Sequence, residues 1–335
     1  MRQIELSGTY REMGEAYGEK IAAQNLNWWW KEPSPRKLSL TKACEQEIAK
    51  HAPGFLEEIQ AIAAVCNTDY YIVLSNMTVA YFVEMACNCV AVSGSNCANG
   101  QAVVARNHDW LDADAKSVTR FTTSPSNGLR SIGFGFTDPG RYDGINEAGL
   151  AIASSSIPGY AGSLQPGFRM NVAQRWVLDT CDSVPAAIDY LKAISHQEGM
   201  AYLVADKEGR VARIEVAPEG IDVVETDQGM VSTVNTFQAT SLRPYDNMPE
   251  NDICHEYKQR IARWYEAGKG HIDVGLAKQL CSDHVDGICE HGEGWDNPGG
   301  TIYSWVAALG TNELELAHGR PCETPYEHIQ LQVGD

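Results

Sequence analysis

The sequence predicts a mixed α+β protein, on three observations. Apolar residues recur at helical spacing through most of the first 86 residues, whereas from Cys89 onward they alternate with small or polar residues as they do in strands. Further along, a pair of helical segments is followed by a second block of strands. This order fits a four-layer αββα sandwich, in which two stacked antiparallel sheets are covered by helices on their outer faces.

The N-terminal part is expected to be helical. Thr9 is a suitable N-cap for the first helix, and Pro33 and Pro35 end that stretch. The apolar face of the first helix is formed by Met13, Ala16, Tyr17 and Ile21. Three more helices are expected over residues 43–50, 55–65 and 70–86. We therefore expect a helical N-terminal segment, residues 1–88, packed on a sandwich formed by residues 89–335.

Three consecutive tryptophans, Trp28, Trp29 and Trp30, cannot all lie on one side of a helix. Core packing is the plainer interpretation of their position. An aromatic wall beside a substrate is the alternative, and the sequence leaves both open.

The rest of the chain alternates between strands and helices. Strands are expected over residues 131–136, 142–153 (a hairpin), 201–205, 211–216, 221–225, 230–234, 301–308, 314–317 and 329–333. Helices are expected over residues 171–180, 185–194, 252–267 and 274–281. We interpret Asn146, at the bend of the hairpin, as a structural turn residue.

The stretch from Cys89 to Trp110 predicts a β-hairpin. Val90 and Val92 alternate with small residues, and the dipeptide Asn99-Gly100 is a strong turn signal before the chain returns as a second apolar strand. Folding back would bring the Cys89 thiol near Arg106 and Asp109. Because the thiolate is the nucleophile and positive charge lowers a thiol pKa, this grouping favours a reactive cysteine. A buried structural cysteine beside a surface ion pair is the alternative.

This hairpin resembles the N-terminal-nucleophile hydrolases, in particular the branch holding acyl-coenzyme A:6-aminopenicillanate acyltransferase and the choloylglycine hydrolases. Residues 8–18 and 144–150 resemble further segments of that family. The resemblance implies the αββα fold and a self-cleavage between Asn88 and Cys89. Cys89 would be the nucleophile and its freed α-amine the base, while Asp109 orients that amine and Arg106 flanks the thiolate.

Asn235, in the segment Thr233–Phe237, resembles the family's asparagine that helps to bind the oxyanion, although Thr236 replaces the usual histidine. An asparagine in a strand-end turn is the plainer alternative. Two other positions depart from the acyltransferase: Asn88 stands where it has glycine, and the stretch 297–300 lacks its arginine. Penicillin chemistry is therefore not carried over.

Two other thiols compete with Cys89 by residue type. Cys87 lies two residues before the expected start of the hairpin, and Cys97 lies near its turn, away from Arg106 and Asp109. Both positions favour Cys89 as the nucleophile.

A cysteine- and histidine-rich segment suggests a metal site at first sight. It contains Cys281, His284, Cys289 and His291. The spacing is not a recognised zinc pattern, and the segment resembles a metal-free Ser-Asp-His…Ile-Cys stretch of the acyltransferase group. We expect neither a metal nor a cofactor.

Composition narrows the choice of partners. A formal charge of −18, from 44 acidic against 26 basic residues, disfavours nucleic acid and anionic membranes. The sequence has no apolar run of eighteen residues and no signal-type N-terminus, which favours a soluble, cytoplasmic protein with reduced thiols.

The expected activity is hydrolysis of a linear amide bond in a small acylated amine or amino acid, with the two self-cleaved fragments forming a heterodimer. One alternative is an acyl-coenzyme A-dependent acyltransferase. This is disfavoured because the sequence has no glycine-rich phosphate loop or basic cluster for the coenzyme. The other alternative is a non-catalytic protein that kept the fold.

Overall fold

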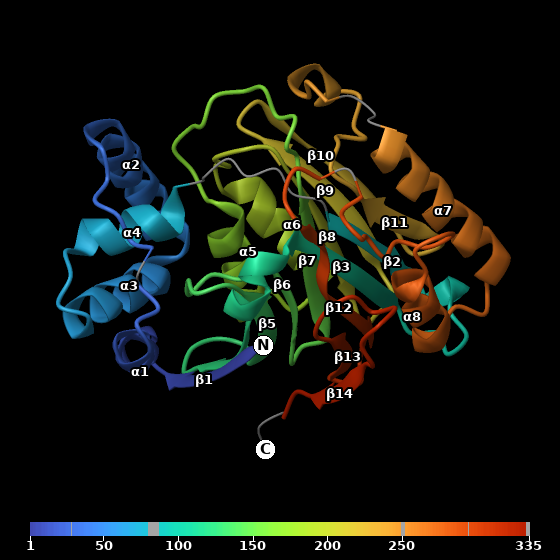
Figure 1. Cartoon of the computed structure of the whole chain (residues 1–335), viewed down its shortest axis with the longest axis horizontal. Coiled ribbons are helices and arrows are strands. Elements are labelled where there is room, and N and C mark those ends of the chain that lie inside the picture. The colour runs from blue at the N-terminus through green and yellow to red at the C-terminus, as the bar shows by residue number, and fades with distance from the viewer. Residues whose placement is uncertain (28, 80–86, 249–251, 294, 333–335) are drawn as a thin grey trace.

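The computed structural model describes the chain except for residues 28, 80–86, 249–251, 294 and 333–335 (Figure 1). Two sheets stack face to face in the described part. The first, eight-stranded sheet has the strand order β1 (Arg2–Gly8), β4 (Thr119–Pro125), β5 (Ser131–Gly135), β6 (Asp143–Asn146), β7 (Leu150–Ser156), β8 (Met200–Asp206), β9 (Val211–Ala217) and β10 (Gly220–Thr226). The second, six-stranded sheet has the order β11 (Met230–Thr233), β2 (Cys87–Val92), β3 (Val103–Leu111), β12 (Gly299–Ala308), β13 (Glu313–Ala317) and β14 (Glu327–Gln330).

Helices cover both outer faces. The N-terminal helices, which Figure 1 shows beside the first sheet, are α1 (Tyr10–Gln24), α2 (Pro35–His51), α3 (Pro53–Val65) and α4 (Tyr70–Thr78). Behind the first sheet lie α5 (Met170–Thr180) and α6 (Val184–Ala193), and behind the second lie α7 (Asp252–Gly268) and α8 (Val274–Ser282). The predicted αββα sandwich is confirmed. In the described residues no helix combines the length and the apolarity that crossing a bilayer needs.

The core between the two sheets contains side chains of the predicted hairpin, including Cys89. Alternate residues of β2 and β3 point into it, among them Cys89, Ala91 and Val104, and meet Phe134 and Leu203 from the first sheet. The intervening residues of the same two strands face α7 and α8 instead. Side-chain alternation along a strand thus decides which residues of β2 lie between the sheets.

The N-terminus differs from the expectation of a purely helical segment, because Arg2–Gly8 forms a strand that pairs in parallel with β4. Ile4 and Leu6 are buried while their neighbours are exposed, which is the period of a strand. The first helix then begins at Tyr10 behind a capping box of Thr9 and Glu12. The helix expected over residues 70–86 ends at Thr78, and the part of that range from residue 80 lies outside the described residues.

Buried charged side chains link the N-terminal helices to α5, one of the helices that cover the first sheet. Arg175 on α5 lies 3.4 Å from the Glu58 carboxylate on α3 and 2.8 Å from that of Asp179. The Tyr10 hydroxyl also donates to Asp179 across 3.1 Å. Because the three charged side chains are buried, separating the helices would leave charge unpaired in the core.

Two of the three tryptophans can be placed. The indole N–H of Trp29 donates to the Thr137 hydroxyl across 2.8 Å, and both Trp29 and Trp30 pack partly buried against the main core. Trp28 lies outside the described residues. The contacts of Trp29 and Trp30 fit core packing better than a substrate wall.

Candidate active site

The predicted hairpin is present and sets the register of the site. β2 and β3 pair antiparallel, with Cys89 opposite Arg106 and Cys87 opposite His108. Gly100 bends the chain at φ +71°, a left-handed conformation that glycine adopts without strain. The strand begins two residues earlier than the sequence predicted, so Cys87 and Cys89 both lie in it and point to the same side.

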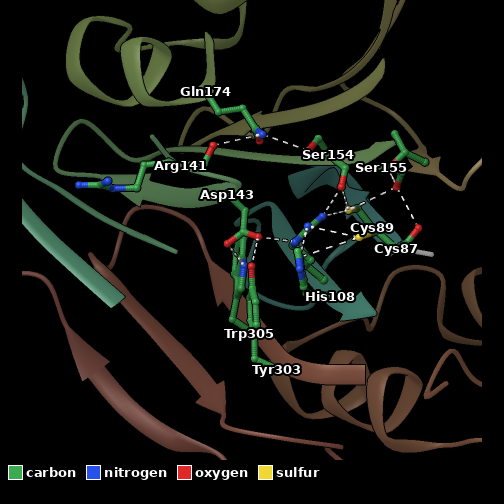
Figure 2. A network of polar contacts seen from close by, with 12 residues as sticks. Cys87, Cys89, His108, Arg141, Asp143, Ser154, Ser155, Gln174, Tyr303 and Trp305 are labelled. Atoms are coloured by element: carbon green, nitrogen blue, oxygen red, sulfur yellow. Dashed lines mark hydrogen bonds and ion pairs between the residues drawn. The ribbon is translucent and has the colours of Figure 1, made fainter. Parts of the chain in front are cut away.

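Arg106 is the cation of the site and reaches both thiols. Its Nη1 lies 3.0 Å from Cys89 Sγ, and its Nη2 lies 3.5 Å from Cys87 Sγ (Figure 2). Nη1 also donates to the Ser154 carbonyl, and Nε pairs with the Asp143 carboxylate on the facing sheet. Burial opposes the charge on Arg106, but Asp143 and the two thiols raise its pKa well above the usual value.

Asp143 is held in place by two side chains of β12. The Tyr303 hydroxyl donates to Asp143 Oδ2 across 2.7 Å, and the Trp305 indole N–H donates to Oδ1 across 2.9 Å (Figure 2). All these side chains are buried. The Asp143 carboxylate therefore holds the Arg106 guanidinium at Nε, while Nη1 and Nη2 face the two thiols. A buried charge pair whose carboxylate also accepts hydrogen bonds is rigid.

The two thiols differ in their surroundings. Cys89 is fully buried, with Sγ 3.5 Å from the Ser154 carbonyl oxygen, and it pairs with Arg106 on one side and Thr233 of β11 on the other. Cys87 is the first residue of β2, and its carbonyl accepts a hydrogen bond of 2.9 Å from Ser155 Oγ. Burial raises the pKa of the Cys87 thiol to about 12, against the lowering effect of Arg106.

Asn235 meets Cys87 rather than Cys89. Its Oδ1 accepts a hydrogen bond from the Cys87 backbone N–H across 2.7 Å. Its Nδ2 donates to the Ser156 carbonyl at 2.9 Å and lies 3.4 Å from the Ser156 hydroxyl. Asn235, which the sequence predicted as an oxyanion donor, therefore contacts the backbone nitrogen of Cys87.

Asp109 lies on the other side of the same strands. Its carboxylate accepts a 2.6 Å hydrogen bond from the Thr301 hydroxyl and one of 3.3 Å from Asn88 Nδ2. Burial raises the pKa of Asp109 to about 7, the Thr301 hydrogen bond lowers it, and the nearby Glu290 raises it further. Asp109 is therefore linked to the thiol strand through Asn88, the residue between the two cysteines.

His108 lies on the same side of β3 as Arg106. Its Nδ1 accepts from Arg106 Nη2 at 2.8 Å and lies 3.9 Å from Cys87 Sγ, and its ring stacks on Tyr303 with centroids 4.6 Å apart. Burial and the charge of Arg106 hold its pKa well below the usual range, so the ring is neutral.

Several site residues were missed in the sequence, namely His108, Asp143 and Thr301. The first sheet supplies Asp143 and β12 supplies Thr301, so no local spacing marks them. His108 alone carried a signal, since it alternates with Arg106 on a predicted strand.

The two stacked sheets between layers of helices match the N-terminal-nucleophile hydrolase fold. The chain is similar to a mutant of the conjugated bile acid hydrolase from Clostridium perfringens, at 14% identity and a TM-score of 0.51 over 72% of this chain and 92% of that one. It is also similar to the penicillin V acylase from Agrobacterium tumefaciens, at 15% identity and a TM-score of 0.50 over 73% and 86% of the two chains. At such identities the likeness shows the fold alone.

The chain belongs to the acyl-coenzyme A:6-aminopenicillanic acid acyl-transferase family, whose sequence model matches residues 93–323. No curated protein matches it significantly in sequence. The matched span includes Arg106, Asp109 and Asn235 but begins after Cys87 and Cys89. Family membership therefore does not choose between the two thiols.

Proposed function

We propose that this protein is a cysteine amidase that hydrolyses a linear amide bond of a small acylated amine or amino acid through a thioester. The observation that carries the proposal is the surroundings of Cys87. Its thiol lies 3.5 Å from the Arg106 guanidinium, and its nitrogen is bonded to Asn235 at 2.7 Å. A thiol, a cation that stabilises the thiolate and a neutral amide group are the components that acyl transfer to sulfur requires.

Cys87 replaces Cys89, which the sequence favoured, as our candidate nucleophile. An N-terminal nucleophile must end in a free α-amine, and scission before Cys89 would cut β2 behind two residues that pair with β3. Scission before Cys87 instead leaves every described pair between β2 and β3 within one fragment. Cys89 lies one step deeper between the sheets, where it contributes to the core and to the surroundings of Arg106.

Activation would be a self-cleavage before Cys87. The Cys87 sulfur attacks the carbonyl carbon of residue 86, the C–N bond breaks, and the thiol proton passes to the leaving nitrogen. Water then hydrolyses the thioester. The nitrogen of Cys87 changes from a non-basic amide to an amine with a pKa of about 7.7–8.0, which accepts a thiol proton near neutral pH.

Turnover would use the same atoms. The α-amine takes the proton of the Cys87 thiol, the sulfur attacks the substrate amide, and the α-ammonium protonates the leaving amine. Asn235 Nδ2 donates to the oxyanion in place of its longer, 3.4 Å contact with Ser156 Oγ. Asp109 is a positioning residue, because it acts on the thiol strand through Asn88.

The runner-up is acyl transfer to an amine, the reaction in the family's name. Both reactions share the Cys87 thioester and differ in what removes the acyl group. Measuring whether the acyl group passes to water or to an added amine therefore distinguishes hydrolysis from acyl transfer.

Denaturing mass spectrometry of the purified chain tests the proposal. Two fragments, the longer beginning at Cys87, are expected. A fragment shorter by one cysteine and one asparagine residue would return the nucleophile to Cys89. An intact chain whose thiols ignore acylating reagents would overturn the amidase in favour of a non-catalytic protein.

A further inference from the structure

A cluster of cysteine and histidine side chains is formed by the segment that follows α8 and by the connection between β13 and β14. The sequence grouped Cys281 with His284 and His291, but the Cys281 thiol is buried against Ser304 and Tyr326. Cys322, from the connection between β13 and β14, takes its place. The ligand atoms of His284, His291 and Cys322 all lie within 4.8 Å of one another.

Cys289 places a second sulfur beside His291, one member of this group of three. Its Sγ lies 3.9 Å from His291 Nε2, and Cys322 Sγ lies 3.3 Å from that same nitrogen. The side chains of Cys289 and Cys322 also interact with each other. One imidazole nitrogen therefore faces two thiols.

We propose that His284, Cys289, His291 and Cys322 bind one zinc ion. With Zn–S bonds of about 2.3 Å and Zn–N bonds of about 2.0–2.1 Å, the ligand atoms of a tetrahedral site lie roughly 3.3–3.8 Å apart. For a sulfur–nitrogen pair this geometry gives about 3.5–3.6 Å. The two distances, 3.3 Å and 3.9 Å, lie on either side of that value and within about 0.4 Å of it. Two thiolates and two imidazoles suit zinc, whereas magnesium and calcium require oxygen ligands.

The sequence led to the opposite expectation for a physical reason. The fourth ligand lies 31 residues beyond His291 and arrives through strand pairing, so the local spacing holds only three of the ligands. The grouping with Cys281 matched no zinc pattern because Cys281 belongs to the core.

The ion would act as a structural clip. All four ligand positions would come from the protein, which is the closed type of zinc site. Cys289 is buried, His291 and Cys322 are partly exposed, and His284 is exposed. Glu290, between two ligands, donates its N–H to Thr301 Oγ1 at 3.0 Å and accepts from the Thr301 N–H at 2.9 Å. Since Thr301 donates to Asp109, the clip would stabilise the segment that holds this carboxylate.

Metal titration of the reduced, chelator-treated full chain tests the site without any assay of turnover. We expect one equivalent of Zn²⁺, and with Co²⁺ the visible bands of a tetrahedral ion together with thiolate charge-transfer bands. Cys322→Ser should weaken Zn²⁺ binding by at least about tenfold, and so should His284→Gln, which changes an exposed ligand. Cys66→Ser and His328→Gln, which change a thiol and a histidine outside the cluster, are matched controls and should bind as the wild type does.

Three results would overturn the proposal. They are a reduced chain that binds no stoichiometric metal, a cobalt complex without thiolate bands, and affinities that do not change in the Cys322 and His284 variants. A Cys289–Cys322 disulfide, found by mass spectrometry in a protein that also fails to bind metal after reduction, would assign the two thiols to redox chemistry instead.

Discussion

The side-chain oxygen of Asn235 accepts a hydrogen bond from the backbone N–H of Cys87, with 2.7 Å between oxygen and nitrogen. The two residues are 148 positions apart, so the fold itself brings them together. An amide oxygen that accepts from a peptide N–H can accept equally from an α-ammonium group. The contact that fixes the strand in the uncut chain could therefore hold the catalytic nitrogen after scission.

Cys87→Ala should abolish both scission and turnover, because it removes the proposed nucleophile. The loss of turnover should exceed about a thousandfold, as for other covalent catalysts. Cys89→Ala should still be cut and should retain activity. Mass spectrometry and amide hydrolysis of both variants, with Cys66→Ser as a control, check this. The reverse pattern would restore Cys89 as the nucleophile.

Asn235→Ala should lower kcat by about 10²–10³, the usual cost of losing one oxyanion donor. KM should change much less, since the donor binds charge that develops only in the transition state. The exposed Asn247→Ala is a matched control and should keep the wild-type rate. Equal effects on kcat and KM would assign Asn235 a role in binding or folding only.

The Arg106–Asp143 pair should be strongly coupled in stability. Arg106→Gln or Asp143→Asn alone leaves a buried charge without its partner, at a cost of about 3–5 kcal/mol in the free energy of unfolding. The double variant should cost less than the sum of the two. Urea unfolding of all four proteins, each in a Cys87→Ala background, measures this cycle. Additive losses would show that the pair does not interact energetically.

Asp109 should make stability fall as pH rises. Its pKa is about 7 in the folded chain and about 3.9 when unfolded, so between these values the folded state holds a proton that the unfolded state has released. Each pH unit in this window should then remove up to about 1.4 kcal/mol. Asp109→Asn should lose that slope. Urea unfolding of both proteins from about pH 4 to pH 7 gives the difference, and parallel curves would contradict it.

Local patterns predicted the hairpin and most helices and strands, because turn residues and side-chain periods act over a few residues. The first strand was missed although Ile4 and Leu6 alternate correctly, since its partner β4 begins more than a hundred residues later. The Asp143 contact with Arg106 depends on the stacking of two sheets, which no local spacing encodes.

The choice of thiol illustrates the same limit. Cys87 and Cys89 lie on the same side of one strand, so the local pattern treats them alike. Their long-range contacts distinguish them, because the Cys87 N–H donates to Asn235 whereas Cys89 packs in the core between the sheets.

β1 covers the edge of β4, whose other neighbour is β5. A protein engineered to start at Cys87 would therefore present β4 as an open edge with a row of unsatisfied backbone groups. Such a truncation should aggregate instead of yielding a minimal enzyme, and co-expression of residues 1–86 as a separate peptide should rescue it. The N-terminal piece would then serve as an intramolecular chaperone as well as a lasting subunit.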